Sequence, residues 1–312
     1  MVAQKVGVLF PGQGAQYVGM GKDGAAQCES IRRIYDEADR ISGLPLSRLC
    51  FEGPEETLAR TLYAQPAIFV TSLALFRFLE EKLDGLKPDF VAGLSLGEFT
   101  ALTATGSLSF SDGLRLVKLR AEFMEKSAQQ HPGIMASVIG LTQPQCEEIA
   151  RETGASLANL NAPDQFVLSG SVTAVEKAAS LAEAGGARRV MRLKVGGAFH
   201  SPLMESARKD LEEALKNVRI QGPRCHFVAN ASAQEEKDPE RIRRLLGEQV
   251  TKPVRWIETM WRARALGVQR FIETGPGRVL KGLAKRIDPT LEVHSFEKLD
   301  DLDGIASLFE KV

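Results

Sequence analysis

Residues 89–98, with the sequence DFVAGLSLGE, decide how this chain is expected to fold. A short apolar run ends at Gly93 and a helix-prone run begins at Glu98, so the segment predicts a strand, a tight turn and a helix. The turn contains Gly-x-Ser-x-Gly, and a side chain at Gly93 or Gly97 would collide with the neighbouring backbone. Such a turn presents Ser95 near a helix N-terminus, which suits a nucleophile. Glycine and serine are common, so an ordinary strand-to-helix turn remains the alternative on the motif alone.

The composition is that of a globular protein without a charge bias. The chain has 312 residues, 44% of them hydrophobic and 26% charged, and Lys plus Arg balance Asp plus Glu at 40 each. This balance gives no reason to expect nucleic acid or a membrane as a partner, and an acidic partner would have to meet a local basic patch. The N-terminal run is too short for a signal peptide, and no run approaches membrane-spanning length. We therefore expect a cytoplasmic protein.

Cysteines and histidines are few and scattered. The chain has four of each, and the cysteines form no Cys-x-x-Cys pair. Metal-binding sites in small domains usually place such residues at short, regular spacings. We therefore expect reduced thiols and no structural metal.

The first part of the chain alternates strands with helices. The run KVGVLF (5–10) predicts a buried strand closed by the glycine-rich turn PGQG (11–14). This turn lacks the third glycine of a dinucleotide-binding loop, and the acids that follow fall within a helix, which argues against that function. Helices are predicted over 30–42, 55–62 and 67–82, the last opened by Gln65-Pro66. The alternation predicts a parallel sheet with helices on both faces.

The middle of the chain has a different pattern. Strands are predicted over 133–141, 155–160, 166–171 and 189–195, and helices over 142–152 and 173–184. The order β-α-β-β-α-β is that of a ferredoxin-like unit. We expect residues 129–197 to form this small subdomain, inserted into a larger α/β subdomain made of residues 1–128 and 198–312, with Gly196-Gly197 at the return point.

The last part of the chain returns to the larger subdomain. Helices are predicted over 202–217, 239–249 and 253–265, and from 278 to 287. Strands are predicted over 225–229, 271–273 and 292–296.

A serine nucleophile needs a base, and only a histidine supplies an imidazole. His226 and His294 lie in strand-like runs, where a satisfied, half-buried histidine is common, and His131 lies in a polar loop. His200 directly precedes Ser201-Pro202, a helix start with serine as the N-cap. The positive end of that helix would keep the ring neutral, as a general base requires. His200 is the candidate base by elimination, and a structural role is the alternative.

Arg120 lies at the centre of an apolar helix face. At about 100° per residue, Leu116, Val117, Phe123 and Met124 surround it on a helix over 113–126. An unpaired buried guanidinium costs several kcal/mol, so it must meet an anion. One candidate is a carboxylate elsewhere in the chain, and the other is the carboxylate of a substrate held by the guanidinium fork.

Short motifs along essentially the whole chain carry a family resemblance. They are FPGQGAQ (10–16), QPA (65–67), GLSLGE (93–98), LR (119–120), NLNAP (159–163), AFHS (198–201), Gln249 before PVRW (253–256), and ETGPG (273–277). In this combination and order they resemble the malonyl-CoA:acyl-carrier-protein transacylases and the related acyltransferase domains of polyketide synthases. The resemblance implies a larger α/β-hydrolase-like subdomain beside the ferredoxin-like one.

The resemblance implies a ping-pong reaction without a cofactor. Ser95, with His200 as general base, would take the malonyl group from malonyl-CoA as an ester. The phosphopantetheine thiol of an acyl carrier protein would then accept it. Arg120 would bind the malonyl carboxylate.

Further roles are implied for five other positions. The backbone N–H groups of Gln13 and Leu96 would form the oxyanion hole. Gln249 would orient the histidine through its backbone carbonyl, so that a Ser-His dyad replaces the usual triad. Gln65 and Asn161 would line the cleft.

The chain departs from the family pattern at two positions. Leu94 stands where a histidine often precedes the serine, and Gly197 replaces the first histidine of a His-Ala-Phe-His motif. Phe199 is retained, and its ring is expected to crowd a branching methyl on the acyl group. We therefore expect malonyl to be preferred over methylmalonyl, by no more than about 10–200-fold for a single methyl.

Other functions and partners remain open from the sequence. A serine thioesterase or esterase shares the same turn, a discrete polyketide acyltransferase looks alike, and a non-catalytic carrier-binding scaffold is a third reading. The implied carrier protein is acidic, and Arg278, Lys281, Lys285 and Arg286 form one candidate docking patch, unless they are only a solvated helix face. We expect a monomer that serves fatty-acid synthesis.

Overall fold

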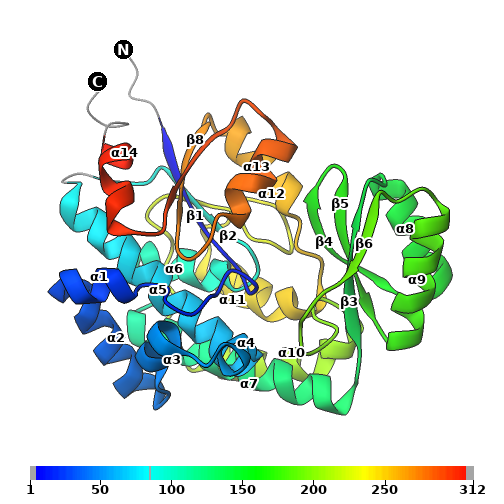
Figure 1. Cartoon of the computed structure of the whole chain (residues 1–312), viewed down its shortest axis with the longest axis horizontal. Helices are drawn as coiled ribbons and strands as arrows, with labels where there is room; N and C mark the ends of the chain where they lie inside the picture. Colours follow the sequence, from blue (N-terminus) through cyan, green and yellow to red (C-terminus); the bar gives the residue numbers. More distant parts are fainter. Residues whose placement is uncertain (1–4, 84–85, 307–312) are drawn as a thin grey trace.

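Two separate sheets organise the molecule. The computed structural model of the chain describes residues 5–83 and 86–306. A five-stranded parallel sheet forms the larger part, and a four-stranded antiparallel sheet with its own two helices lies at one end (right in Figure 1). The predicted mixed α/β fold is confirmed.

The parallel sheet has the strand order β7-β2-β1-β8-β9. Its strands are β1 (Val6–Phe10), β2 (Phe90–Gly93), β7 (His226–Phe227), β8 (Arg270–Thr274) and β9 (Glu292–Phe296). Successive side chains of β1 enter different cores: Val8 and Phe10 pack on one face of the sheet and Leu9 on the other. Both faces are therefore covered, as a parallel sheet requires.

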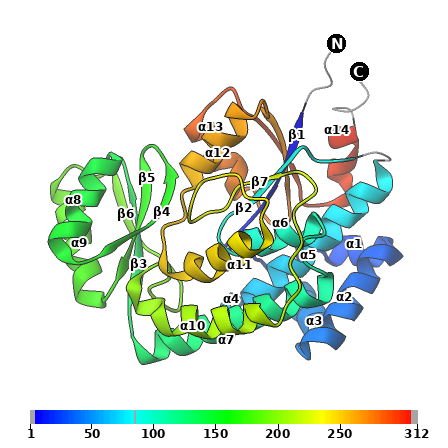
Figure 2. The same cartoon turned by 180° about the vertical axis from the view of Figure 1, so that it is seen from behind.

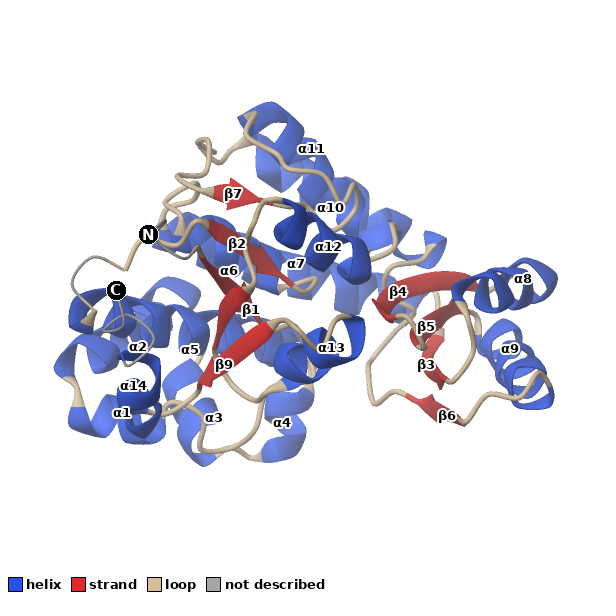
Figure 3. Ribbon diagram, turned by 90° about the horizontal axis from the view of Figure 1, so that it is seen from above, coloured by secondary structure: helices blue, strands red, loops and turns tan. Residues whose placement is uncertain are grey.

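The two faces carry unequal layers of helices (Figures 2 and 3). One face is covered by α12 (Trp256–Ala265) and α13 (Val279–Ile287), through residues such as Trp256 and Leu280. The larger layer on the other side consists of α1 (Lys22–Gln27), α2 (Glu29–Ser42), α3 (Leu46–Glu52), α4 (Glu55–Ala59), α5 (Thr61–Lys82), α6 (Gly97–Ala104), α7 (Phe110–Gln130), α10 (Glu205–Lys216), α11 (Pro239–Glu248) and α14 (Leu302–Ala306).

The long helix α5 differs from the sequence prediction. It begins at Thr61, before Gln65-Pro66, so that Pro66 lies inside the helix. Nearly every side chain from Ala64 to Leu79 is buried, and this packing outweighs the proline. By length and composition α5 also meets the requirements of a membrane span, contrary to the expectation that no run would. In the structure, 83% of its most apolar window is buried, as in a core helix.

The antiparallel sheet has the order β4-β5-β3-β6. Its elements follow the predicted sequence: β3 (Ile134–Ile139), α8 (Gln143–Thr153), β4 (Ser156–Ala162), β5 (Gln165–Gly170), α9 (Val172–Ala184) and β6 (Arg189–Arg192). Val138, Phe166 and Leu168 pack with the helices on one face. The opposite face looks toward the parallel sheet, and an isolated bridge between Asn159 and Val254 joins the two parts.

Three late elements are shorter than predicted. The strand over 225–229 is reduced to the two residues of β7, because Val228 turns away to bridge Glu235. The helix expected from 253 begins only at Trp256, since Val254 pairs with β4. The helix expected from 202 begins as a 3-10 turn (Pro202–Met204). Two more 3-10 turns, Gln249–Thr251 and Leu299–Asp301, complete the fold.

Candidate active site

Ser95 sits in a sterically constrained turn between β2 and α6. Its φ of 52° lies in the left-handed region, which is uncommon for a residue other than glycine. A Cβ atom on Gly93 would lie 1.9 Å from the backbone of Gly97, and one on Gly97 would lie 2.2 Å from the carbonyl oxygen of Phe10. The predicted need for both glycines is confirmed, and the turn holds Ser95 at the carboxyl end of the sheet.

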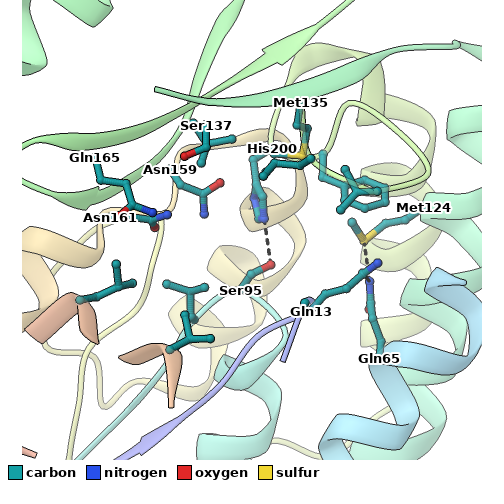
Figure 4. Close-up of a pocket in the computed structure, with 18 of the residues that line it drawn as sticks. Gln13, Gln65, Ser95, Met124, Met135, Ser137, Asn159, Asn161, Gln165 and His200 are labelled. Carbon is teal, nitrogen blue, oxygen red and sulfur yellow. Dashed lines mark hydrogen bonds between the residues drawn. The ribbon is translucent and has the colours of Figure 1, made fainter. Parts of the chain in front are cut away.

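His200 faces Ser95 across the cavity (Figure 4). Its Nε2 lies 2.8 Å from Ser95 Oγ, and its Nδ1 lies 2.8 Å from the carbonyl oxygen of Gln249 and 3.2 Å from that of Lys252. Because carbonyls only accept hydrogen bonds, Nδ1 carries the proton and Nε2 accepts from the serine hydroxyl. Within the described residues, no carboxylate contacts the ring.

The neutral state of His200 has a different cause from the one expected. Burial, and secondly the positive charge of Arg120, lower the pKa of His200 to about 4, and the two backbone carbonyls only partly oppose this. The ring is therefore neutral at pH 7, as predicted. Desolvation and a neighbouring cation account for this, rather than the positive end of the following helix, which begins as a short 3-10 turn.

Arg120 is buried, with 1% of its surface exposed, and lies beside Ser95. One terminal nitrogen donates to Gln65 Oε1 at 2.7 Å, and the other donates to Ser95 Oγ at 2.9 Å and to Gln249 Oε1 at 2.8 Å. Burial lowers the pKa of Arg120 to about 10, so it is charged at neutral pH. It makes no direct ion pair with a carboxylate in the described part of the chain, and its Nε–H has no partner there.

Three further residues lie close to Ser95 and Arg120: Gln13, Gln65 and Leu96. Gln65 Nε2 donates to Gln13 Oε1 at 3.2 Å, and Gln13 Nε2 donates to Thr61 Oγ1 at 3.1 Å. Gln13 follows β1, and Leu96 is the N-cap of α6. Neither the Gln13 nor the Leu96 backbone N–H donates a hydrogen bond to a described residue, so both are available to a ligand.

A cavity of about 240 Å³ separates Ser95 from the antiparallel sheet. Polar side chains on the sheet wall point into it, and Figure 4 shows Ser137, Asn159, Asn161 and Gln165 opposite Ser95. Ser137 Oγ and Asn161 Oδ1 are buried without a partner in the described residues. The apolar lining near Ser95 includes Met124, Met135, Leu193 and Phe199.

The two departures from the family pattern fit the local packing. Gly197 backs onto α7, and a Cβ atom there would lie 2.4 Å from the Cβ of Ala128. Leu94 lines the cavity, and its carbonyl oxygen lies 2.5 Å from where a Cβ on Gly12 would stand. Phe199 is 95% buried against the cavity, since only 5% of its surface is exposed.

Sequence reasoning missed Asn230 and Glu98. Asn230 Oδ1 accepts from the Ser95 backbone N–H at 2.7 Å, and Asn230 Nδ2 donates to the Gly93 carbonyl at 2.8 Å. Glu98 accepts from the Asn230 backbone N–H at 3.1 Å and from Gln249 Nε2. These partners lie more than 100 positions apart in the chain, so no local pattern could reveal the contacts. Only the position of Glu98 beside the serine motif offered a signal.

The candidate basic patch lies on α13, the helix whose Val279 and Leu283 line the cavity. The exposed Lys281 and Lys285 belong to this helix. The two arginines are engaged by acids: Arg278 lies 3.5 Å from Glu297, and Arg286 pairs with Asp164 at 2.6 Å.

The other histidines stand apart from Ser95. His226 pairs with Glu235 at 2.8 Å, His294 lies half-buried on β9, and the exposed His131 follows α7. The choice of His200 by elimination therefore agrees with the geometry.

A serine bonded to a neutral histidine, beside unused backbone N–H groups, is typical of enzymes that form acyl-serine intermediates. Comparison with known proteins agrees. The acyl transferase domain family matches residues 8–293. The malonyl CoA-acyl carrier protein transacylase of Bacillus subtilis (strain 168) is 41% identical over 293 residues, which is 92% of each chain.

Solved structures are similar over the same length. An acyl-carrier-protein-S-malonyltransferase from Bartonella henselae superposes with a TM-score of 0.94 at 38% identity, covering 98% of this chain and 100% of that one. A malonyl-transacylase in complex with its type II PKS acyl-carrier protein gives a TM-score of 0.93 at 36% identity, covering 98% and 100%. This chain belongs to the malonyl-CoA:acyl-carrier-protein transacylase family of acyl transferases.

Proposed function

We propose that this protein transfers the malonyl group of malonyl-CoA to the phosphopantetheine thiol of an acyl carrier protein. The activity is the one named for its relatives. The observation that carries the proposal is the buried Arg120, which is charged, makes no ion pair with any described residue and touches the candidate nucleophile Ser95. Most ester substrates offer no carboxylate to such a group, whereas a malonyl thioester does.

In the first half-reaction, Ser95 Oγ attacks the thioester carbonyl while its proton passes to His200 Nε2. The oxyanion that forms is stabilised by the backbone N–H groups of Gln13 and Leu96, and such donors are each worth about 3–4 kcal/mol. The C–S bond then breaks, and His200 returns the proton to the sulfur of CoA. The malonyl group remains as an ester on Ser95, with its carboxylate on Arg120.

In the second half-reaction, the carrier's phosphopantetheine thiol takes the place of CoA. His200 accepts the thiol proton, the sulfur attacks the ester carbonyl, and the proton passes to Ser95 Oγ as it leaves. The backbone carbonyl of Gln249 keeps the ring oriented throughout, in place of a third carboxylate. No cofactor is required, since the phosphopantetheine belongs to the carrier.

The walls of the cavity support two further assignments. Phe199 bounds the acyl side, and we assign to it the preference for malonyl over methylmalonyl. A kcat/KM for methylmalonyl-CoA equal to or above that for malonyl-CoA would remove this assignment. The amides Asn159, Asn161 and Gln165 on the sheet wall match the two amide groups of a pantetheine arm. Gln65 accepts a hydrogen bond from Arg120, and we assign it to the wall of the same cleft.

We assign the docking of the acidic carrier protein to Lys281 and Lys285, two exposed cations on α13, the helix whose Val279 and Leu283 line the cavity. We also assign residues 129–197 to a ferredoxin-like subdomain inserted into an α/β-hydrolase-like one, which the order β4-β5-β3-β6 supports. The setting we propose is a cytoplasmic monomer that supplies fatty-acid synthesis.

Labelled malonyl-CoA tests the proposal directly. The wild-type protein should become covalently malonylated and pass the label to holo-carrier protein, whereas Ser95→Ala should do neither. Hydrolysis of malonyl-CoA without transfer to the carrier would sink the transacylase function and favour a thioesterase. Full carrier binding and function in Ser95→Ala would instead indicate a non-catalytic scaffold.

A further inference from the structure

Glu98 is a buried carboxylate close to, but not touching, the buried cation. It lies in the first turn of α6 with 1% of its surface exposed, and no basic side chain pairs with it among the described residues. Its Oε1 accepts from the Asn230 backbone N–H, and its Oε2 accepts from Gln249 Nε2. Both carboxyl oxygens therefore act as acceptors, which is the arrangement an ionised carboxylate needs.

The side chain of Gln249 stands between Glu98 and Arg120. Its Oε1 accepts from Arg120 Nη2 at 2.8 Å, while its Nε2 donates to Glu98 and, at 2.9 Å, to the backbone carbonyl of Ser95. Only this orientation of the amide places an acceptor toward the guanidinium and a donor toward the two oxygens. The amide dipole is consequently aligned between the anion and the cation.

The arrangement of Glu98 near Arg120, with Gln249 between them, lowers the free-energy cost of burying the Arg120 cation. A buried cation without a countercharge is strongly unfavourable, and a direct ion pair would occupy the fork that a substrate must use. The burial of Glu98 raises its pKa to about 7, against the opposing effects of Gln249, Asn230 and Arg120, so the anion that balances Arg120 predominates above neutral pH. Glu236 is the other charged group that acts on it, with the same sign, and Glu236 is itself paired with Arg241 at 2.7 Å.

We propose that Glu98 is a positioning residue that balances the charge of Arg120 through the Gln249 amide, so that no carboxylate of the described residues competes with the substrate carboxylate for the guanidinium. The proposal rests on the proposed malonyl transfer. It assigns to Glu98 a role in selecting an acidic acyl group, although Glu98 itself contacts neither substrate nor Ser95 Oγ.

The variant Glu98→Gln is expected to disrupt the hydrogen bonds that link residue 98, Gln249 and Arg120. If the oxygen of the new amide still accepts from the Asn230 backbone N–H, the NH₂ group of that amide faces Gln249 Nε2. Both groups are donors, so no hydrogen bond forms between them. Turning the Gln249 amide relieves that conflict but points its NH₂ at Arg120. Arg120 would then lose one acceptor and the compensating charge together.

The test compares malonyl-CoA with acetyl-CoA as acyl donors to holo-carrier protein. In Glu98→Gln, kcat/KM for malonyl-CoA should fall at least about tenfold, mainly through KM, as expected for one lost hydrogen bond to a charged group. The value for acetyl-CoA should change much less, and Glu98→Asp should restore part of the malonyl activity. Equal losses for both donors, or no loss, would overturn the proposal.

Two controls separate this role from folding and from the proposed function. Asp288→Asn removes another buried carboxylate, one that contacts Arg264 and Thr290 rather than Gln249, and it should leave the malonyl-to-acetyl ratio unchanged. Adding Glu98→Gln to Arg120→Ala should change malonyl transfer no further, and an additive loss would contradict action through Arg120. If Glu98→Gln does not fold, Gln249→Met interrupts the same contact and must give the same loss of selectivity. If the wild-type protein transfers no malonyl group, the proposed function fails, whereas a selective wild type with an equally selective Glu98→Gln refutes this inference alone.

Discussion

The two walls of the cavity differ in how their polar groups are paired. On the wall that carries Ser95, the backbone N–H of Ser95 donates to Asn230, its carbonyl accepts from Gln249, and its hydroxyl meets both His200 and Arg120. On the antiparallel-sheet wall, Ser137 Oγ and Asn161 Oδ1 are buried without a partner among the described residues. Catalytic groups have to be held in place before the substrate binds, which the hydrogen bonds around Ser95 do. Groups that bind a ligand need hydrogen-bonding capacity that the protein itself does not use, as on the antiparallel-sheet wall.

This contrast predicts that substitutions of the groups that hold or deprotonate Ser95 act on the reaction rate, whereas substitutions on the antiparallel-sheet wall act on substrate affinity.

His200→Ala removes the base from the tightly bonded wall. We expect kcat for malonyl transfer to fall by about 10⁴-fold, because the alkoxide of Ser95 can no longer form with help from a base. Steady-state kinetics with holo-carrier protein measure this. The exposed His131→Ala is the matched control and should retain full activity.

Asn230→Ala removes the side chain that fixes the turn without touching the substrate. The Ser95 N–H and the Gly93 carbonyl would lose their partners, and each unpaired buried group costs about 1–3 kcal/mol. We expect a lower melting temperature together with a loss in kcat of about tenfold or more at unchanged KM. The reason is that nothing then holds Ser95 in its strained backbone conformation. Asn217→Ala, at an exposed position, should change neither quantity. A fall in stability with an intact kcat would show that Asn230 only supports the fold.

The pH dependence of acylation tests the burial of His200. An acyl-CoA whose acyl group carries no charge, such as acetyl-CoA, avoids effects on the binding of a substrate carboxylate. Because the pKa of His200 is lowered to about 4, the base stays neutral as the pH falls through its ordinary value. We expect kcat/KM to remain constant from neutral pH to about 5.5 and to fall only below that. A decline centred on the ordinary histidine value of about 6.5 would contradict the buried, neutral ring.

Asn161→Ala removes an unpaired polar group from the antiparallel-sheet wall and should have the smallest effect of these substitutions. We expect KM for malonyl-CoA to rise by about three- to tenfold with kcat nearly unchanged, since the loss is one neutral hydrogen bond to the pantetheine arm. A short malonyl thioester without the distal amide is the control, and its KM should respond less. A fall in kcat with constant KM would place Asn161 with the catalytic wall.

The sequence predicted the parts of this site that depend on local chemistry. Gly93 and Gly97 follow from the steric needs of a single turn, and Arg120 stands out because a helix period places it among apolar side chains. His200 could be chosen because few histidines compete. The signals for the glycines and for Arg120 lie within about one helical turn of the residue concerned, whereas the choice of His200 also uses the small number of histidines in the whole chain.

What could not be predicted depends on contacts between distant segments. Asn230 meets the Ser95 turn from 135 positions away, and nothing in its own surroundings indicates this. The resemblance implied only that Gln249 orients His200, and it gave no sign that the Gln249 side chain also bonds the Ser95 carbonyl from 154 positions away. The start of α5 was also misplaced, because burial along that helix outweighs the local preference set by Pro66. The same holds for the cause of the low His200 pKa, which is the burial that the tertiary structure creates.

The most direct test of the account is the ratio of kcat/KM for malonyl-CoA to that for acetyl-CoA in wild-type protein and in Arg120→Ala. Loss of a buried, hydrogen-bonded charge pair of about 3–5 kcal/mol predicts a fall in this ratio of at least about 100-fold. Arg120→Lys, which keeps the charge but not the fork, should give an intermediate ratio. An unchanged ratio in Arg120→Ala would contradict the claim that Arg120 selects the malonyl group.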